Sequence, residues 1–215
     1  MKDWTGNKNS VFKTLGASNH TEQERAQDDY YATDPIAIDL LLLKEKPSKN
    51  IWECACGEGH LAKALEAKGY NVLPTDLKNR GCGISGIDFL QLDESADFDG
   101  DIITNPPYKH AMKFVLKALG QLKQGRRCYM LLKLTFLEGQ ERYIELFSKC
   151  PPKKIYSFPK RIMCAKNGDF KGMRNGGGSA VAYAWFVWEK GYKGLPQHDW
   201  LYIDEDIKNE RKTTN

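Results

Sequence analysis

Four consecutive residues, Asn105-Pro106-Pro107-Tyr108, are suited to binding an exocyclic amine. The amide oxygen of Asn105 and the carbonyl oxygen of Pro106 can both accept a hydrogen bond from one NH2 group, which draws that nitrogen out of conjugation and aims its lone pair outward. The prolines have no N–H to compete, and their fixed φ angles hold the carbonyl in place. Tyr108 offers a flat ring on which an extruded base can stack. These residues predict a site for an aromatic amine, although Asn-Pro also begins many ordinary turns.

The residues on either side of this turn predict the elements that hold it. Residues 101–104 begin with an acid and continue with an apolar run, which favours a short buried strand that the proline pair ends. Residues 109–124 have apolar side chains at helical spacing and stop before Gly125, which favours a helix. Ligands bind at the carboxyl ends of strands in open α/β sheets, so the turn lies where a ligand is expected.

A second candidate site is the glycine-containing turn of residues 53–59. Residues 50–55 and 71–75 are predicted as strands and residues 59–68 as the helix between them, which together form a right-handed βαβ unit. Gly57 and Gly59 let the backbone approach a ligand closely, and the amino end of the helix favours a negative group. Asp76 closes the second strand, where its carboxylate can hold the two hydroxyls of a ribose.

The pattern Gly57-x-Gly59-x-x-Ala62 also fits the fingerprint of dinucleotide-binding proteins, so a nicotinamide enzyme must be considered. Two features favour a different ligand. Glu53 would repel a pyrophosphate, but it suits the ammonium group of a methionine moiety. Asp88-Phe89 offers a carboxylate that can read an amine and an apolar ring for an adenine. Adenosylmethionine would use all of these residues, whereas a dinucleotide would leave two of them without a role.

The second half of the chain adds three predicted strands and a basic segment. The strands are predicted at residues 128–134, 154–158 and 180–188, the last of them central because it is so apolar. Residues 153–174 carry seven Lys or Arg side chains against one acid, Asp169. With Phe158 and Phe170 nearby, this segment suits a phosphate backbone and an unstacked base. A solvated charged loop is the commoner explanation of such a run.

The composition is that of a globular protein, and 215 residues suffice for one well-cored domain. No apolar run is long enough to span a bilayer, and the first residues lack the apolar segment of a signal peptide, so we expect a cytoplasmic protein with no membrane partner. The six scattered cysteines are expected to be reduced and packed as small hydrophobic residues. Cys54-x-Cys56 has no second pair at zinc-ligand spacing, so we predict no metal site. The net charge of +4 is a mild indication of polyanion binding.

In this order, the motifs resemble those of S-adenosylmethionine-dependent amino methyltransferases. The resemblance rests on residues 31–35, the turn of residues 53–59, Asp76, Asp88-Phe89 and the turn of residues 105–108. More narrowly, residues 16–20 and 29–35 look like the start of the small phage-type DNA N6-adenine methyltransferases, and the likeness covers roughly residues 11–190. It implies a Rossmann-like class I methyltransferase fold. This is a seven-stranded, mostly parallel sheet with helices on both faces and residues 180–188 as one antiparallel strand.

The resemblance also implies a division of the chain and a role for each motif. Residues 28–198 would form the methyltransferase domain, residues 1–27 a polar N-terminal segment and residues 199–215 a charged C-terminal tail. The implied cofactor is S-adenosyl-L-methionine, and the implied partner is DNA in a bacterial or phage-infected host cytoplasm. The implied residues are, for catalysis, Asn105, Pro106, Pro107 and Tyr108; and for the cofactor, Tyr31, Thr33, Glu53, Ala55, Gly57, Gly59, Asp76, Leu77, Asp88 and Phe89. The residues expected from their charge to contact nucleic acid are Lys109, Lys160, Arg161, Lys166, Lys171 and Arg174.

Several alternatives share these motifs. The same turn serves enzymes that methylate an adenine of RNA or a glutamine amide of a protein, and N4 of cytosine is another acceptor, although a serine at position 105 would favour it more. A non-catalytic nucleic-acid-binding relative is an alternative of another class. The chain has no insertion large enough for a separate target-recognition domain. Sequence specificity is therefore expected to be loose or to depend on the short basic segment.

Overall fold

The computed structural model describes residues 30–95, 97–166, 168–175 and 181–202. The predictions for residues 1–27, and for most of the charged C-terminal tail, lie outside these residues. Within the described residues, no helix is long and apolar enough to cross a membrane.

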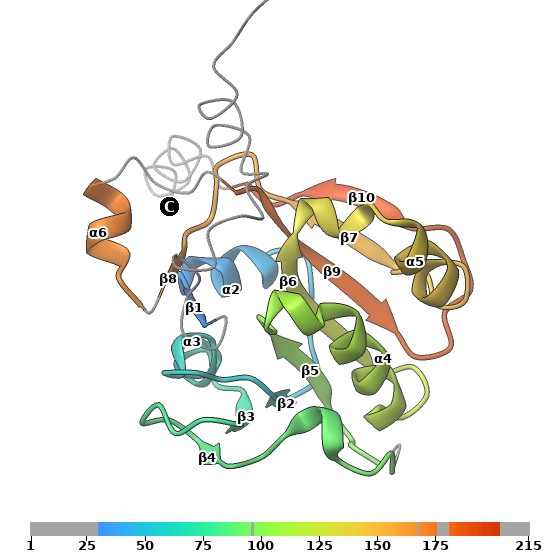
Figure 1. Cartoon of the computed structure of the whole chain (residues 1–215), viewed down its shortest axis with the longest axis horizontal. Coiled ribbons are helices and arrows are strands. Elements are labelled where there is room, and N and C mark those ends of the chain that lie inside the picture. The colour runs from blue at the N-terminus through green and yellow to red at the C-terminus, as the bar shows by residue number, and fades with distance from the viewer. Residues whose placement is uncertain (1–29, 96, 167, 176–180, 203–215) are drawn as a thin grey trace, which may run out of the picture.

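An eight-stranded sheet forms the centre of the molecule (Figure 1). All neighbouring strands run parallel, except that β9 is antiparallel to both β6 and β7. This confirms the predicted mostly parallel sheet with one antiparallel strand. From one edge to the other, the order is β10 (Gln197–Trp200), β7 (Lys154–Ser157), β9 (Tyr183–Glu189), β6 (Arg127–Lys133), β5 (Asp101–Thr104), β2 (Asn50–Glu53), β3 (Asn71–Asp76) and β4 (Ile84–Ser85).

The eighth strand, β10, differs from the prediction, because the charged tail was expected to begin at Asp199. Asp199 and Trp200 instead pair in parallel with Tyr156 and Ser157 of β7, and the next residue, Leu201, is buried. A strand at the edge of a sheet is held by main-chain hydrogen bonds to one neighbour. It therefore needs no apolar pattern, and the polar sequence of β10 gave no sign of it.

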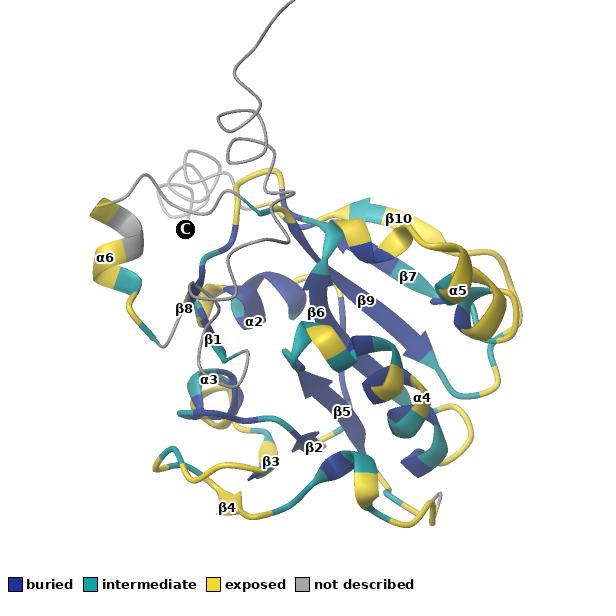
Figure 2. Ribbon diagram, viewed as in Figure 1, coloured by how far each residue is buried: buried dark blue, intermediate teal, exposed yellow. Residues whose placement is uncertain are grey.

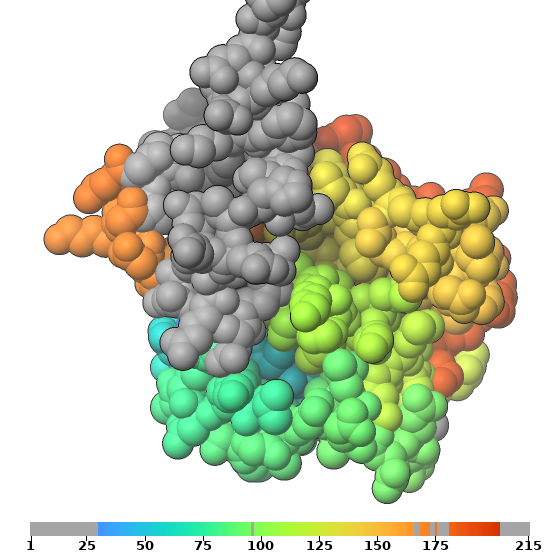
Figure 3. Space-filling view, in the orientation of Figure 1, coloured from blue at the N-terminus to red at the C-terminus, as the bar shows by residue number. Residues whose placement is uncertain are grey.

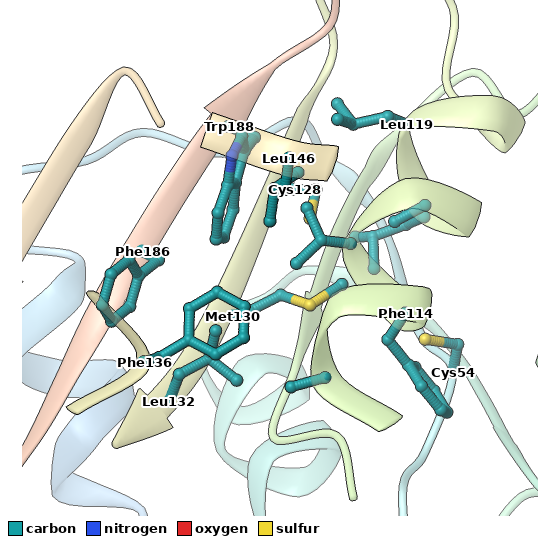
Figure 4. Packing of buried hydrophobic residues seen from close by; sticks show 14 of the residues in the cluster. Cys54, Phe114, Leu119, Cys128, Met130, Leu132, Phe136, Leu146, Phe186 and Trp188 are labelled. Atoms are coloured by element: carbon teal, nitrogen blue, oxygen red, sulfur yellow. The ribbon is translucent and has the colours of Figure 1, made fainter. Parts of the chain in front are cut away.

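Helices cover both faces of the sheet, as predicted (Figure 2). One face packs against α4 (Ala111–Gln121) and against the π-helical segment η6 (Tyr143–Phe147) that follows α5 (Gln140–Arg142). Figure 4 shows Phe114 and Leu119 of α4 on the side of β6 that carries Cys128 and Met130. The other face packs against α2 (Ile36–Leu41) and α3 (His60–Ala67). The two faces alternate along each strand, so that Ile102 and Ile103 of β5 belong to opposite cores.

A second, two-stranded sheet was not predicted. In it, β1 (Tyr31–Thr33) pairs antiparallel with β8 (Cys164–Lys166), with Thr33 opposite Cys164. The strand β8 and the short helix α6 (Phe170–Asn175) both belong to the basic segment of residues 153–174. The pairing joins this segment to β1, which reaches the turn after β5 through Asn105.

Candidate active site

A cavity of about 910 Å³ opens at the carboxyl ends of β2, β3, β5 and β6. In an open α/β sheet this is the edge at which ligands bind. The lining combines both predicted motifs with residues that the sequence did not single out. It consists of Tyr30, Tyr31, Ala32, Thr33, Glu53, Ala55, Cys56, His60, Leu61, Asp76, Leu77, Lys78, Arg80, Asn105, Pro107, Tyr108, Lys109, His110, Ala111, Leu132, Lys133, Thr135, Phe136 and Arg142.

Asn105, directly after β5, presents an unused acceptor at this cavity. Its Nδ2 donates to the carbonyl oxygen of Tyr31 at 3.1 Å and to Oγ1 of Thr33 at 2.8 Å. These two bonds set the orientation of the amide, since a flip would turn its oxygen toward the Tyr31 carbonyl. Oδ1 is then buried with no hydrogen-bond partner among the described residues. Because buried acceptors are nearly always paired, this oxygen is suited to a donor from a ligand.

Tyr108 lies three residues after Asn105 and begins the turn η4 (Tyr108–His110). Its ring contacts three side chains. Ring centroids of Tyr31 and Tyr183 lie 5.6 and 5.8 Å from that of Tyr108, each tilted by 34°. The ammonium nitrogen of Lys133 lies 4.9 Å from the same centroid. Burial, with Cys164 and Tyr183 nearby, raises the pKa of Tyr108 well above its usual value, so the hydroxyl stays neutral. Tyr108 therefore offers a ring for packing and no proton transfer near neutral pH.

Glu53, the last residue of β2, places a buried carboxyl group at the cavity. Burial raises its pKa well above the usual range, against a smaller lowering by the Ala62 amide, and Asp76 raises it further. Oε2 has no hydrogen-bond partner among the described residues. Burial therefore favours the protonated form of this carboxyl group, and a cation close to Oε2 would favour the ionised form. An ammonium group is such a cation.

Asp76, at the end of β3, ties the glycine-containing turn to the sheet. Its carboxylate accepts the N–H of Gly57 and the N–H of Lys78, each at 2.8 Å. Each carboxylate oxygen has two acceptor positions, so both oxygens keep one for a further donor such as a ribose hydroxyl. Asp76 and Leu77 both line the cavity.

The glycine turn is covered by a residue that the sequence did not single out. Gly57 has φ +55°, and a Cβ there would collide with the ring of Tyr30. The Tyr30 hydroxyl accepts the N–H of Glu58 at 3.3 Å, and the Arg80 guanidinium lies 4.3 Å from the ring centroid. We predicted a turn open to a ligand, but in this structure Tyr30 packs directly on it. Gly57 and Gly59 themselves are not among the residues that line the cavity.

Asp88 and Phe89 lie elsewhere than we predicted. Asp88 accepts the N–H of Leu90 at 3.0 Å and so caps the turn η3 (Phe89–Gln91). The Phe89 ring is buried in the core, edge-on to Trp52 at 5.2 Å and stacked on Phe114 at 5.3 Å. Neither residue lines the cavity. The turn η3 directs this ring into the space between β2 and α4, where burial stabilises it.

The basic residues around the cavity are mostly not the predicted ones. Lys109 lines it, but Lys160, Arg161 and Lys171 are exposed and do not, and α6 projects at one side of the molecule (Figure 3). Lys166 lies in β8 and Arg174 in α6, and their side chains are outside the description. The cavity is instead lined by Lys78, Arg80, Lys133 and Arg142. For Lys133 the sequence held a signal, because it is a charged residue at the carboxyl end of an apolar strand.

Comparison with known proteins gives a fold. No family model matches the sequence, and no relative is found among curated protein sequences. Among solved structures, one assigned as a class I S-adenosylmethionine-dependent methyltransferase from Listeria monocytogenes matches with a TM-score of 0.51 and 14% identity, over 95% of this chain and 74% of the other. The chain has the Rossmann-like fold of class I methyltransferases.

Two further matches belong to type I restriction–modification systems. One is a modification subunit of a type I restriction enzyme assigned in Vibrio vulnificus, with a TM-score of 0.50 and 12% identity over 92% of this chain. The other comes from a structural study of a type I restriction–modification system, with a TM-score of 0.52 and 16% identity over 93% of this chain. This chain spans 51% and 49% of their lengths. At such identities the likeness is one of fold.

Proposed function

We propose that this protein transfers a methyl group from S-adenosyl-L-methionine to the exocyclic N6 amine of adenine in DNA, as the phage-type enzymes do that its motifs resemble. The observation that carries the proposal is the buried, unpartnered Oδ1 of Asn105. It belongs to the same cavity as the Tyr108 ring and the carboxyl group of Glu53. An amine acceptor, a stacking surface and a cation-binding carboxyl group are the parts that such a transfer needs.

The cofactor fits the residues at the ends of β2 and β3. Oε2 of Glu53, which has no hydrogen-bond partner among the described residues, would pair with the ammonium group, and Asp76 would accept the ribose hydroxyls. Leu77, Lys78 and Arg80 continue the lining beyond Asp76, where the adenine would follow. When bound, the cofactor supplies a methyl group on a positively charged sulfur.

The chain's own contribution to the reaction is positioning. Asn105 Oδ1 and the carbonyl of Pro106 would accept the two N6 hydrogens, so that the nitrogen lone pair points at the methyl carbon. N6 would take the methyl group from sulfur, which would keep the electron pair of the broken C–S bond, and N6 would release one proton to solvent. Holding the two reactants in line supplies much of the rate without a covalent intermediate on the protein.

A nucleic acid fits the acceptor side of the cavity better than a protein tail does. Lys109, Lys133 and Arg142 line this side together with the rings of Tyr108 and Phe136. Cationic side chains neutralise phosphates, and aromatic rings stack on an unpaired base. Extruding a base from its strand costs a few kcal/mol, which such stacking offsets.

The test is an acceptor panel. The purified protein is incubated with tritium-labelled adenosylmethionine and with DNA, RNA or protein, and the labelled product is identified by nucleoside or peptide mass spectrometry. We expect N6-methyldeoxyadenosine in DNA. Label in RNA or in a glutamine side chain would replace the proposed acceptor, and a protein that binds the cofactor but labels none of the three would contradict the proposed activity.

A further inference from the structure

Lys133 stands out among the basic residues of the cavity because of where its strand ends. It is the last residue of β6, paired with Tyr183 of β9, and it is half-buried. The neighbouring strand β5 ends one residue before Asn105. Lys133 and Asn105 therefore approach the cavity from adjacent strand ends.

The ammonium group of Lys133 lies at the ring on which the target base would stack. Its Nζ is 4.9 Å from the Tyr108 ring centroid, within the range of a cation–π contact. A base stacked on Tyr108 would lie in van der Waals contact with that ring. Because Nζ lies over the ring in this structure, a stacking base would displace it from the ring face. The flexible lysine side chain can then donate a hydrogen bond to the edge of the base.

In the described part of the chain, the ammonium group of Lys133 forms no ion pair and no hydrogen bond, and it contacts the Tyr108 ring. The basic residues at the other end of the same strands are different. Arg127 pairs with Glu45 and Glu189, and Lys154 pairs with Glu45. Those residues are committed to holding the sheet together, whereas the donors of Lys133 are available to a ligand.

The atoms next to the target amine are hydrogen-bond acceptors. In adenine, N6 lies between the ring nitrogens N1 and N7, and the two N6 hydrogens would already be bound by Asn105 and Pro106. We propose that Lys133 donates a hydrogen bond to one of these ring nitrogens and thereby selects adenine and fixes its orientation. This inference rests on the proposed function. A phosphate of the same nucleotide is a poorer partner, because the sugar separates it from the base edge.

A deaza-base exchange combined with a lysine substitution tests this contact. Oligonucleotides carry adenine, 7-deazaadenine or 1-deazaadenine at a methylated position, and kcat/KM is measured for wild type and for Lys133→Met. For wild type we expect kcat/KM to be about tenfold lower with one of the two analogues than with adenine, as for the loss of a hydrogen bond to a charged group. For Lys133→Met, the kcat/KM values for that analogue and for adenine should differ by less than about twofold.

Three controls keep the outcomes distinct. Lys46→Met removes a charge from an exposed residue next to Glu45, at the opposite end of the sheet. This variant should still show the difference of about tenfold in kcat/KM between adenine and the analogue. Lys133→Arg keeps a cationic donor and should retain part of the discrimination, and unchanged cofactor binding by calorimetry shows that each variant is folded. Wild-type activity on unmodified adenine tests the proposed function separately.

The inference would be overturned if wild type methylates adenine and both analogues equally well, or if the analogues lose as much with Lys133→Met as with wild type. It would also be overturned if Lys133→Met lowered kcat/KM equally for all three bases and reduced the slope of log kcat/KM against log salt concentration by about one. That pattern is the signature of a phosphate contact.

Discussion

The side-chain nitrogen of Asn105 lies 2.8 Å from the hydroxyl oxygen of Thr33, and this contact joins the turn after β5 to the N-terminal strand β1. It fixes which end of the Asn105 amide is left for a ligand. A residue 72 positions away in the sequence therefore sets the orientation of the proposed amine acceptor.

Replacing Thr33 tests this arrangement. Thr33→Val removes the hydroxyl acceptor, so the Asn105 amide keeps only the Tyr31 carbonyl and can rotate. We expect kcat for methyl transfer to fall by about fivefold, the worth of one hydrogen bond of roughly 1 kcal/mol, with the protein still folded. Thr33→Ser keeps the hydroxyl and should retain most of the activity. Equal activity of the valine and serine variants would contradict the role given to this contact.

The buried Glu53 predicts a pH-dependent stability of the protein without cofactor. Its pKa is raised by burial, so the folded state holds the proton more tightly than the unfolded state does. This contribution is complete below the ordinary glutamate pKa of about 4.3 and is lost as the pH rises toward the raised value, at about 1.4 kcal/mol per pH unit at most. Urea unfolding between pH 5 and 8 should show this decline in wild type and a smaller one in Glu53→Gln. Parallel curves for the two proteins would contradict it.

The ion cluster around Glu45 is expected to be important for stability. The carboxylate side chain is 1% exposed and accepts bonds from Lys154 at 2.7 Å and from Arg127 at 3.1 Å. Burial alone would raise its pKa, but the hydrogen bonds from Lys154 and Tyr156 lower it below the usual value. Glu45→Ala leaves Lys154 without its ionic partner and Arg127 with Glu189 alone, and it should lower the free energy of unfolding by about 3 kcal/mol.

The matched control for that variant is Glu145→Ala. Glu145 pairs with Lys149 at 2.7 Å on the surface, and its side chain is 49% exposed. Its loss should change the free energy of unfolding by at most about 1 kcal/mol. If the two substitutions cost the same in chemical denaturation, the Glu45 cluster does not have the role assigned to it.

Alanine substitutions at Gly57 and Gly125 distinguish the cost of backbone strain from the cost of a steric collision. Both have positive φ, +55° and +79°, but a Cβ on Gly57 would meet the Tyr30 ring, whereas a Cβ on Gly125 would meet open space. Gly125→Ala should cost about 1 kcal/mol of stability from strain alone. Gly57→Ala should cost more and should also weaken cofactor binding, and equal costs would show that Tyr30 yields without penalty.

The two short motifs of this chain could be predicted from its sequence. The turn of residues 105–108 and the βαβ unit around Gly57 are short, and each combines a buried strand with residues that can only end or bend it. Their meeting at one cavity follows from the rule that parallel strands present their carboxyl ends at one edge.

What the sequence could not show depends on contacts between distant residues. The pairing of β1 with β8 joins residues more than a hundred positions apart, and no local pattern marks it. Phe89 follows an acidic residue after a glycine-rich loop whether its ring faces a ligand or the core, and only the space between Trp52 and Phe114 decides for the core. Tyr30 was missed for the same reason, since its importance lies in its packing on the turn at Gly57.

The most direct test of the account is Asn105→Ala, assayed for methyl transfer from tritiated adenosylmethionine to DNA and for cofactor binding by calorimetry. We expect a loss of at least about 100-fold in the rate of transfer, comparable to removing one preorganised polar group from an active site. We also expect a dissociation constant for the cofactor within about twofold of wild type. Transfer by Asn105→Ala at the wild-type rate would contradict the account.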